Sequence, residues 1–250
     1  MKLLVLFAFL LSPFFPAAGQ DINALIIEGN RIEAIPDEMG AFHKFREVLK
    51  IQPLNIYALS KCSELCSRIA KRQTNITIRD DYYLAAKTYA GIALKINPNS
   101  SEANCAMAMM LGRSSMAKSG KDKIQNAREV KKYVDLALKN DPQNFKAWHI
   151  LGRWHYEISN LSVFERTAVK ILYGGVPPAS IKESIAAFEK VKTIAPGFVL
   201  NYLEMAKAYK HDDKKEKAIA YLKAMLTLPN KTEDDASIKD QGRDLIKEWE

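Results

Sequence analysis

Cysteine and histidine are scarce in this chain, with three and four residues respectively among 250. Three cysteines are an odd number for a secreted disulfide framework. A bridge between Cys62 and Cys66, one helical turn apart, would have unfavourable geometry, and two thiols without further ligands nearby make a poor zinc site. We therefore expect no metal or other cofactor, and we expect Cys62, Cys66 and Cys105 to be small buried apolar side chains.

The short motifs of common enzyme classes are absent as well. The sequence contains no H-E-x-x-H, no G-x-S-x-G and no glycine-rich phosphate loop, so the chemistry of those motifs has no support. His149, Arg153 and Glu157 share one face of an expected helix at i, i+4 and i+8, whereas His155 points elsewhere. We predict that the protein is not an enzyme, and a Cys–His pair brought together by the fold is the less favoured alternative.

The sequence shows neither an alternating strand pattern nor a low-complexity tract. Its formal net charge is +8, which favours acidic partners or anionic surfaces. No RNA-binding aromatic–basic motif and no zinc-finger spacing accompanies that charge, so we expect no nucleic-acid partner.

Long apolar runs are confined to the N-terminus. One lysine precedes the apolar run LLVLFAFLLSPFF over residues 3–15, which is too short to span a bilayer comfortably. The small residues Ala17 and Gly19 follow at the positions that a signal peptidase reads. We interpret residues 1–19 as a signal peptide of an exported bacterial protein, periplasmic or secreted, with an N-terminal membrane anchor as the alternative.

Proline recurs after amphipathic segments, at Pro53, Pro98, Pro142, Pro196 and Pro229. Because proline cannot continue a helix, each one marks a helix end and a turn. The position eight residues before each proline holds Phe45, Ala90, Val134, Phe188 and Tyr221. The position five residues before holds Val48, Ala93, Ala137, Val191 and Ala224. This spacing keeps the side chains on one helix face and indicates a helical repeat.

The segments after the prolines repeat too. Trp148, Leu151, Gly152 and His155 are close to the tetratricopeptide pattern W-x2-L-G-x2-Y. The position of Gly152 is small in every copy, where the residues are Ser63, Ala108, Gly152 and Ala206. A glycine costs a helix about 1 kcal/mol relative to alanine, so we expect a packing reason for it, namely the close approach of the paired helix.

These patterns predict an all-α, tetratricopeptide (TPR)-like solenoid of antiparallel helix pairs over residues 20–250. The expected repeats and the C-terminal capping helix cover residues 22–53, 56–98, 101–142, 145–196, 199–229 and 233–250. The fourth repeat carries an inserted helix, which a capping box from Ser162 to Glu165 begins and Gly174 ends.

Several of these segments resemble the regulator of microtubule dynamics family of TPR-like proteins. The resemblance extends roughly over residues 40–248 and rests on HILGRWHYEISNLSVFERTAVKIL, AAFEKVKTIAPGF, LPNKTEDDASIKDQGRDL and GKDKIQNAREVKKYVDLALKNDP. It implies an all-helical, non-enzymatic adaptor, and animal members are linked to microtubules and to membrane contact sites. Because an exported protein does not meet tubulin, we expect the resemblance to carry the fold and the binding character but not the microtubule role.

In a TPR stack the first helix of each repeat lines an inner groove. The groove positions hold one basic residue in each of four repeats, namely Arg68, Arg113, Arg153 and Lys207. A row of cations in a groove attracts carboxylates or phosphates. The groove-binding candidates are Arg68, Arg113, His149, Arg153, Tyr156, Lys207 and Lys210. The alternative is a solvated face whose cations pair with Glu64, Glu102 and Glu157.

The sequence therefore predicts an exported, non-enzymatic adaptor that binds a protein or peptide in its concave groove, and the charge of the groove favours an acidic ligand. The alternative is a binder of lipid or of another anionic small ligand. An enzyme with an unrecognised site is the third and least favoured hypothesis.

Overall fold

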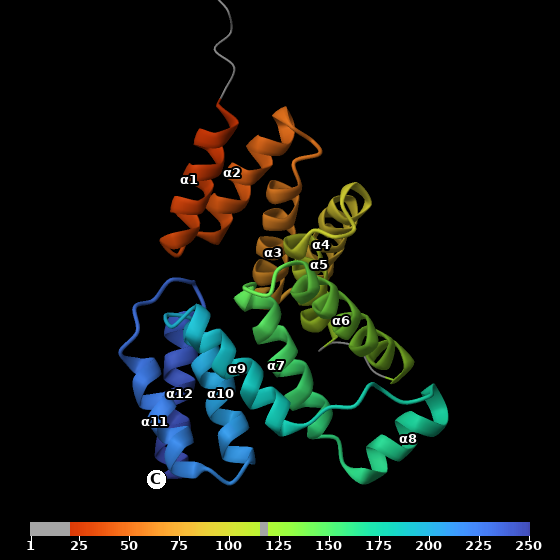
Figure 1. Ribbon diagram of the computed structural model, residues 1–250. Helices are drawn as coiled ribbons and strands as arrows, with labels where there is room; N and C mark the ends of the chain where they lie inside the picture. Colours follow the sequence, from red (N-terminus) through yellow and green to blue (C-terminus); the bar gives the residue numbers. More distant parts are fainter. Residues whose placement is uncertain (1–20, 116–119) are drawn as a thin grey trace, which may run out of the picture.

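The computed structural model describes residues 21–115 and 120–250, and within these ranges it contains helices but no strands (Figure 1). The helices are α1 (Ile22–Ala34), α2 (Glu38–Ile51), α3 (Ile56–Arg72), α4 (Ile76–Ile96), α5 (Ser101–Ser114), α6 (Gly120–Asn140), α7 (Phe145–Ser159), α8 (Val163–Tyr173), α9 (Ile181–Ile194), α10 (Val199–His211), α11 (Lys215–Leu226) and α12 (Asp235–Trp249). The all-α prediction is confirmed.

The helices pack in pairs, as Figure 1 shows, with α1 on α2, α3 on α4, α5 on α6, α7 on α9, and α10 on α11. The inserted helix α8 interrupts the fourth pair and contacts α6, whereas α12 covers α10 and α11 at the C-terminal end. The first helices of successive pairs also contact one another, which builds the predicted solenoid.

Polar side chains fix where the helices begin. Asn55, Ser100 and Asn144 each accept a hydrogen bond from the backbone N–H three residues later, at 3.0, 3.2 and 3.0 Å. Such caps satisfy donors that have no partner within the helix. A proline lies two residues before each cap, in the turn, so the proline and the cap together set the register of α3, α5 and α7.

Gly152 has the packing reason that the repeat pattern predicts. An added Cβ at this position would lie 2.7 Å from Cε1 of Phe188, on the paired helix α9. Ser184, also on α9, donates a hydrogen bond to the Gly152 carbonyl at 2.8 Å. Side chains of α9 therefore lie directly against the backbone of α7, and glycine is the residue that allows this contact.

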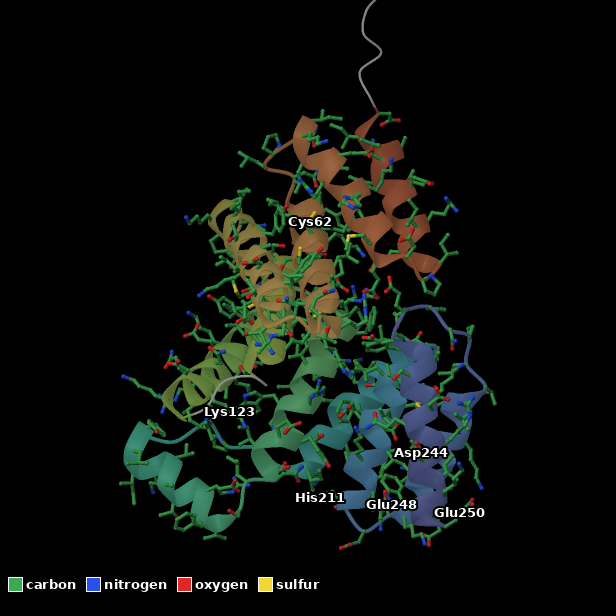
Figure 2. All side chains as sticks on the ribbon, turned by 180° about the vertical axis from the view of Figure 1, so that it is seen from behind. Cys62, Lys123, His211, Asp244, Glu248 and Glu250 are labelled. Carbon is green, nitrogen blue, oxygen red and sulfur yellow. The ribbon has the colours of Figure 1, made fainter. Side chains whose placement is uncertain are left out.

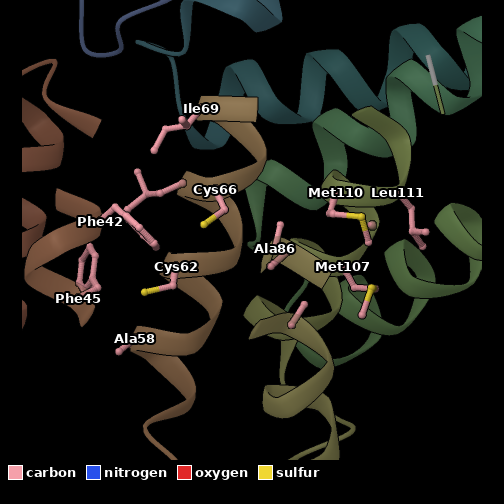
Figure 3. Close-up of a cluster of buried hydrophobic side chains, with 14 of the residues drawn as sticks. Phe42, Phe45, Ala58, Cys62, Cys66, Ile69, Ala86, Met107, Met110 and Leu111 are labelled. Carbon is pink, nitrogen blue, oxygen red and sulfur yellow. The ribbon is translucent and has the colours of Figure 1, made fainter. Parts of the chain in front are cut away.

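The three cysteines are free and buried. Cys62 and Cys66 point from α3 toward Phe42 and Phe45 of α2, as Figure 3 shows. Burial raises the pKa of the Cys66 and Cys105 thiols to about 12 and also raises that of Cys62. The thiols are therefore protonated at neutral pH, and their predicted role as apolar core residues is confirmed.

The C-terminal end of the solenoid returns to its N-terminal end. Arg72, at the end of α3, lies 3.0 Å from a carboxylate oxygen of Glu233 and 3.2 Å from one of Asp234, in the loop before α12. Lys71 lies 3.5 Å from Asp234, and the backbone N–H of Glu38 donates to Glu233 at 2.7 Å. Figure 1 shows this loop beside the lower ends of α1 and α2. We call these contacts the clasp.

The predicted signal peptide, residues 1–19, lies outside the described residues. Within the described ranges, every helix is too short or too polar to cross a bilayer.

Candidate binding site on the inner face

Charged and polar side chains of α3, α5, α7 and α10 contact one another between successive helix pairs. Lys146 of α7 reaches past α5 and lies 2.6 Å from Glu64 of α3. Arg113 of α5 donates to the Ser67 hydroxyl of α3 at 2.8 Å, and Arg153 of α7 faces α10. We call this surface, which includes Glu64, Arg113, Lys146, His149, Arg153, Glu204 and Lys207, the inner face.

Arg68 is enclosed by carboxylates and is not available to a ligand. Its guanidinium lies 3.0 Å from Glu33 and 3.7 Å from Glu64, and it donates to Glu38. Only 7% of the residue is exposed. Arg68 therefore joins α3 to α1 and α2, and the prediction that it binds a ligand in the groove loses its physical basis.

Glu64 is the anion that Arg68 and Lys146 share. Burial alone would raise its pKa, but the charges of Lys146, Lys61 and Arg68 outweigh burial and hold the pKa well below its usual range. The carboxylate is therefore ionised at any physiological pH. It neutralises Lys146, which leaves that lysine little attraction for a further anion.

Arg113 is the cation of the inner face that has no ion pair among the described residues. Its one side-chain partner there is the Ser67 hydroxyl. Burial, together with the charge of Arg68, lowers the pKa of Arg113 to about 10. The guanidinium stays protonated at neutral pH, with N–H groups that a carboxylate can still accept.

Arg153 is the second cation with spare donors. Its guanidinium lies 3.7 Å from Glu157 and 3.9 Å from Glu204, both long for ion pairs, and 36% of its side chain is exposed. Its Nε is buried without a hydrogen-bond partner. Burial would raise the pKa of Glu204, but Arg153 and Lys207 hold it below the usual value.

His149, one helical turn before Arg153 on α7, is buried against Phe188 and Phe198. Asn201 donates to the Phe188 carbonyl at 2.9 Å, which turns its side-chain oxygen toward Nδ1 of His149 at 3.2 Å. Nδ1 therefore carries the proton and donates, while Nε2 is a buried acceptor without a partner. Burial and the charge of Arg153 lower the pKa of His149 to about 4, so the ring is neutral at physiological pH.

The buried His149 makes the fold sensitive to acid. Its folded-state pKa of about 4 lies below the ordinary value of 6.5, so the unfolded chain takes up the proton first and stability falls as pH drops through this window. We expect a loss of about 2 kcal/mol from this group between pH 7.5 and pH 5.

Urea unfolding at both pH values measures this loss in wild type and in His149→Gln. The glutamine variant is expected to lose less stability than wild type over the same interval, since it keeps a donor for Asn201 but does not titrate. His211→Gln, at an exposed position labelled in Figure 2, is the matched control and should behave like wild type. Equal pH dependence in wild type and His149→Gln would contradict the buried neutral ring.

The other candidates lie toward the C-terminal end of the inner face. Lys207 pairs with Glu204 at 3.3 Å. The half-buried Tyr156 ring lies 6.1 Å from the ring of His211, and the Lys210 ammonium lies 6.0 Å from the ring of Trp249. Among these candidates, Lys207 and Arg153 share the partner Glu204.

The sequence named Glu64 and Glu157 as possible partners of the cations, but it did not identify the other acidic side chains that pair with these arginines and lysines. Glu204 stands three residues before Lys207 on one helix, and that spacing could have identified it. Glu33, Glu38 and Asp234 carry no comparable signal, because their partners Arg68 and Arg72 lie in other elements. A periodic pattern indicates which residues share a helix face, but it does not indicate which side chains from distant parts of the sequence form ion pairs.

Comparison with known proteins identifies relatives over most of the chain. The family model described as regulator of microtubule dynamics protein 1-3 matches residues 28–250. Regulator of microtubule dynamics protein 1 of Caenorhabditis elegans is 27% identical over 74% of this chain and 80% of its own length. Protein 3 of Xenopus laevis is 28% identical over 78% of this chain and 44% of its own length. Protein 3 of Bos taurus is 29% identical over 63% and 34%. The chain thus spans less than half of either vertebrate protein.

A solved structure shares the fold. A thermophilic TPR protein of Thermus thermophilus aligns with a TM-score of 0.62 at 11% identity, over 89% of this chain and 97% of that protein. The predicted TPR-like solenoid is therefore confirmed.

The relatives overturn the predicted localisation. They are animal proteins named as regulators of microtubule dynamics, and microtubules belong to the interior of the cell. The prediction of a bacterial exported protein, periplasmic or secreted, is therefore wrong. It rested on the composition of the first residues, which lie outside the described part of the chain.

Proposed function

Because the chain belongs to the family of regulator of microtubule dynamics proteins 1-3, we propose that this TPR-like solenoid is a non-enzymatic adaptor whose inner face binds an acidic segment of a partner protein. The observation that carries the proposal is the pair Arg113 and Arg153. Arg113 has no ion pair among the described residues, and the ion pairs of Arg153 are 3.7 and 3.9 Å long. A solenoid of this kind uses its concave surface for extended ligands.

The chemistry of the two arginines favours carboxylates. A guanidinium presents paired N–H donors that match the two oxygens of a carboxylate, and such charge-assisted bonds are stronger than neutral ones. Both groups lie in partly buried surroundings, where charge interactions are screened less than at an open surface. An aspartate or glutamate of an extended segment would satisfy donors that the folded chain leaves unused.

The carboxylates of the inner face restrict which anions fit. Glu64 and Glu204 are both ionised and flank the two arginines. A continuous polyphosphate backbone would meet them at successive positions and be repelled. A protein segment with spaced acidic residues meets only the cations, which favours it over nucleic acid.

Fluorescence polarisation with labelled peptides of equal length and acidic, neutral or basic composition tests the proposal. The wild-type chain should prefer the acidic peptides, and added salt should weaken that binding, because exposed charges are screened beyond roughly 8–10 Å. Arg153→Glu should weaken it by at least about tenfold, the equivalent of one lost charge-assisted contact.

The matched control is Arg243→Glu, on the exposed side of α12, which should bind like wild type. Equal affinity of both variants for the acidic peptides, or no preference of wild type for them, would contradict the proposal. Native mass spectrometry of the purified chain tests the alternative that the ligand is a lipid or another anionic small molecule. A co-purified lipid would favour that alternative.

A further inference from the structure

The helix α8 presents an apolar face that nothing in the described structure covers. The exposed fractions of Val163, Phe164, Ile171 and Leu172 are 83%, 83%, 75% and 66%. Phe164 and Ile171 lie at the centre of this face, and Val163 and Leu172 lie about 90° to either side of it. Other exposed large apolar residues, such as Leu54 and Leu84, belong to different helices or turns. Four together on one short helix form a patch of the kind that marks an interaction site.

Hydrogen bonds hold both ends of the helix. Ser162 and Glu165 form a capping box at its start, and Arg166 donates to the Ser159 carbonyl at the end of α7 at 2.9 Å. At its other end Arg128 of α6 donates to the Gly175 carbonyl at 3.0 Å. Thr167, within the exposed face, donates its hydroxyl to the Val163 carbonyl at 2.8 Å, so it presents no free donor there. Figure 1 shows α8 projecting from the body of the solenoid.

The charges on and near α8 indicate which kind of partner covers its apolar face. Lys170 stands on α8, and Lys123 of α6, labelled in Figure 2, is close enough for its charge to act on Glu165 of α8. The one acidic residue of α8, Glu165, is engaged by its own cap. The net charge of +8 opposes pairing of two copies of the chain. An anionic lipid surface, in contrast, attracts the cations and accepts the apolar face.

We propose that α8 is a membrane-docking helix, whose face of Val163, Phe164, Ile171 and Leu172 lies in the surface of an anionic lipid bilayer while Lys170 and Lys123 contact the headgroups. An eleven-residue helix is too short to span a bilayer, so it lies along the interface, as amphipathic helices with flanking cations do. This surface is separate from the inner face and does not depend on the proposed function.

A dye that reports its surroundings tests this docking on the full chain. The three native cysteines are buried and protonated, so a single Ile171→Cys can be labelled selectively. On adding vesicles of phosphatidylcholine with phosphatidylserine, we expect a blue shift of its emission, and a smaller one with phosphatidylcholine alone. Lys170→Glu in the labelled chain should reduce the apparent partitioning about tenfold.

Leu84→Cys is the matched control, at an exposed apolar position on α4. This variant has the same residues 1–20 as the Ile171→Cys chain, so any membrane binding by that segment is common to both. The emission of its dye should not shift. The proposal is overturned if the dye at position 171 does not shift, or if the dye at position 84 shifts equally. It is also overturned if the dye at position 171 shifts without vesicles as protein concentration rises, because that result would identify a second copy of the chain as the occupant.

Discussion

Glu38→Gln is expected to destabilise the protein by about 3–5 kcal/mol, the usual cost of removing one partner from a buried ion pair. The Glu38 carboxylate has no exposed surface and accepts from Arg68 through one oxygen and from Arg72, at 2.6 Å, through the other. Glutamine keeps one acceptor but turns a donor toward the second guanidinium. Arg68 and Arg72 would then lose the negative charge that both contact, which destabilises the buried cluster.

Urea unfolding of the two proteins measures this loss. Glu248→Gln, at an exposed position of α12 labelled in Figure 2, is the control and should stay within about 0.5 kcal/mol of wild type. The double variant Glu38→Gln/Arg72→Gln should recover part of the stability, because neighbouring charges couple. A single variant as stable as wild type would show that Glu38 does not link these helices.

Gly152→Leu is expected to cost more than about 2 kcal/mol, since overpacking a close contact typically costs 1–3 kcal/mol or more. The first added atom already lies 2.7 Å from the Phe188 ring, and a leucine places three further carbons in the same space. The hydrogen bond from Ser184 to the Gly152 carbonyl ties the helices together at this position, so they cannot separate without losing it.

Gly112→Leu on α5 provides the control with the same substitution. An added Cβ there meets no atom within 4 Å, and leucine has a higher helix propensity than glycine by roughly 0.5–1 kcal/mol. The two variants should therefore change the free energy of unfolding in opposite directions. A loss of similar size in both would contradict the contact with Phe188 as the cause of the cost at position 152.

The fold could be predicted because its signals are local. Pro53, Pro98 and Pro142 mark the turns, and Asn55, Ser100 and Asn144 cap the helices that follow. The small residue at the Gly152 position recurs because each helix pair has the same geometry. Each of these features acts within one or two turns of chain, where a sequence pattern can record it.

The binding site was predicted only in part, for the same reason. Helix periodicity places Arg68, Arg113 and Arg153 on one side of the solenoid, but it cannot show that Arg68 is enclosed by Glu33 and Glu38 while Arg113 has no ion pair among the described residues. Such pairing depends on how far α1 and α2 turn toward α3. The capping box of α8 was likewise visible in the sequence, whereas the exposure of its apolar face was not.

The clasp has a consequence for the order in which the chain is completed during synthesis. Repeats of an open solenoid contact only their neighbours, so each can acquire its contacts as soon as the next repeat emerges. Here the ion pairs of Arg72 with Glu233 and Asp234 join residues more than 160 positions apart. Arg72 and the N–H of Glu38 therefore lack these partners until the loop before α12 has left the ribosome, so the first helices complete their contacts last.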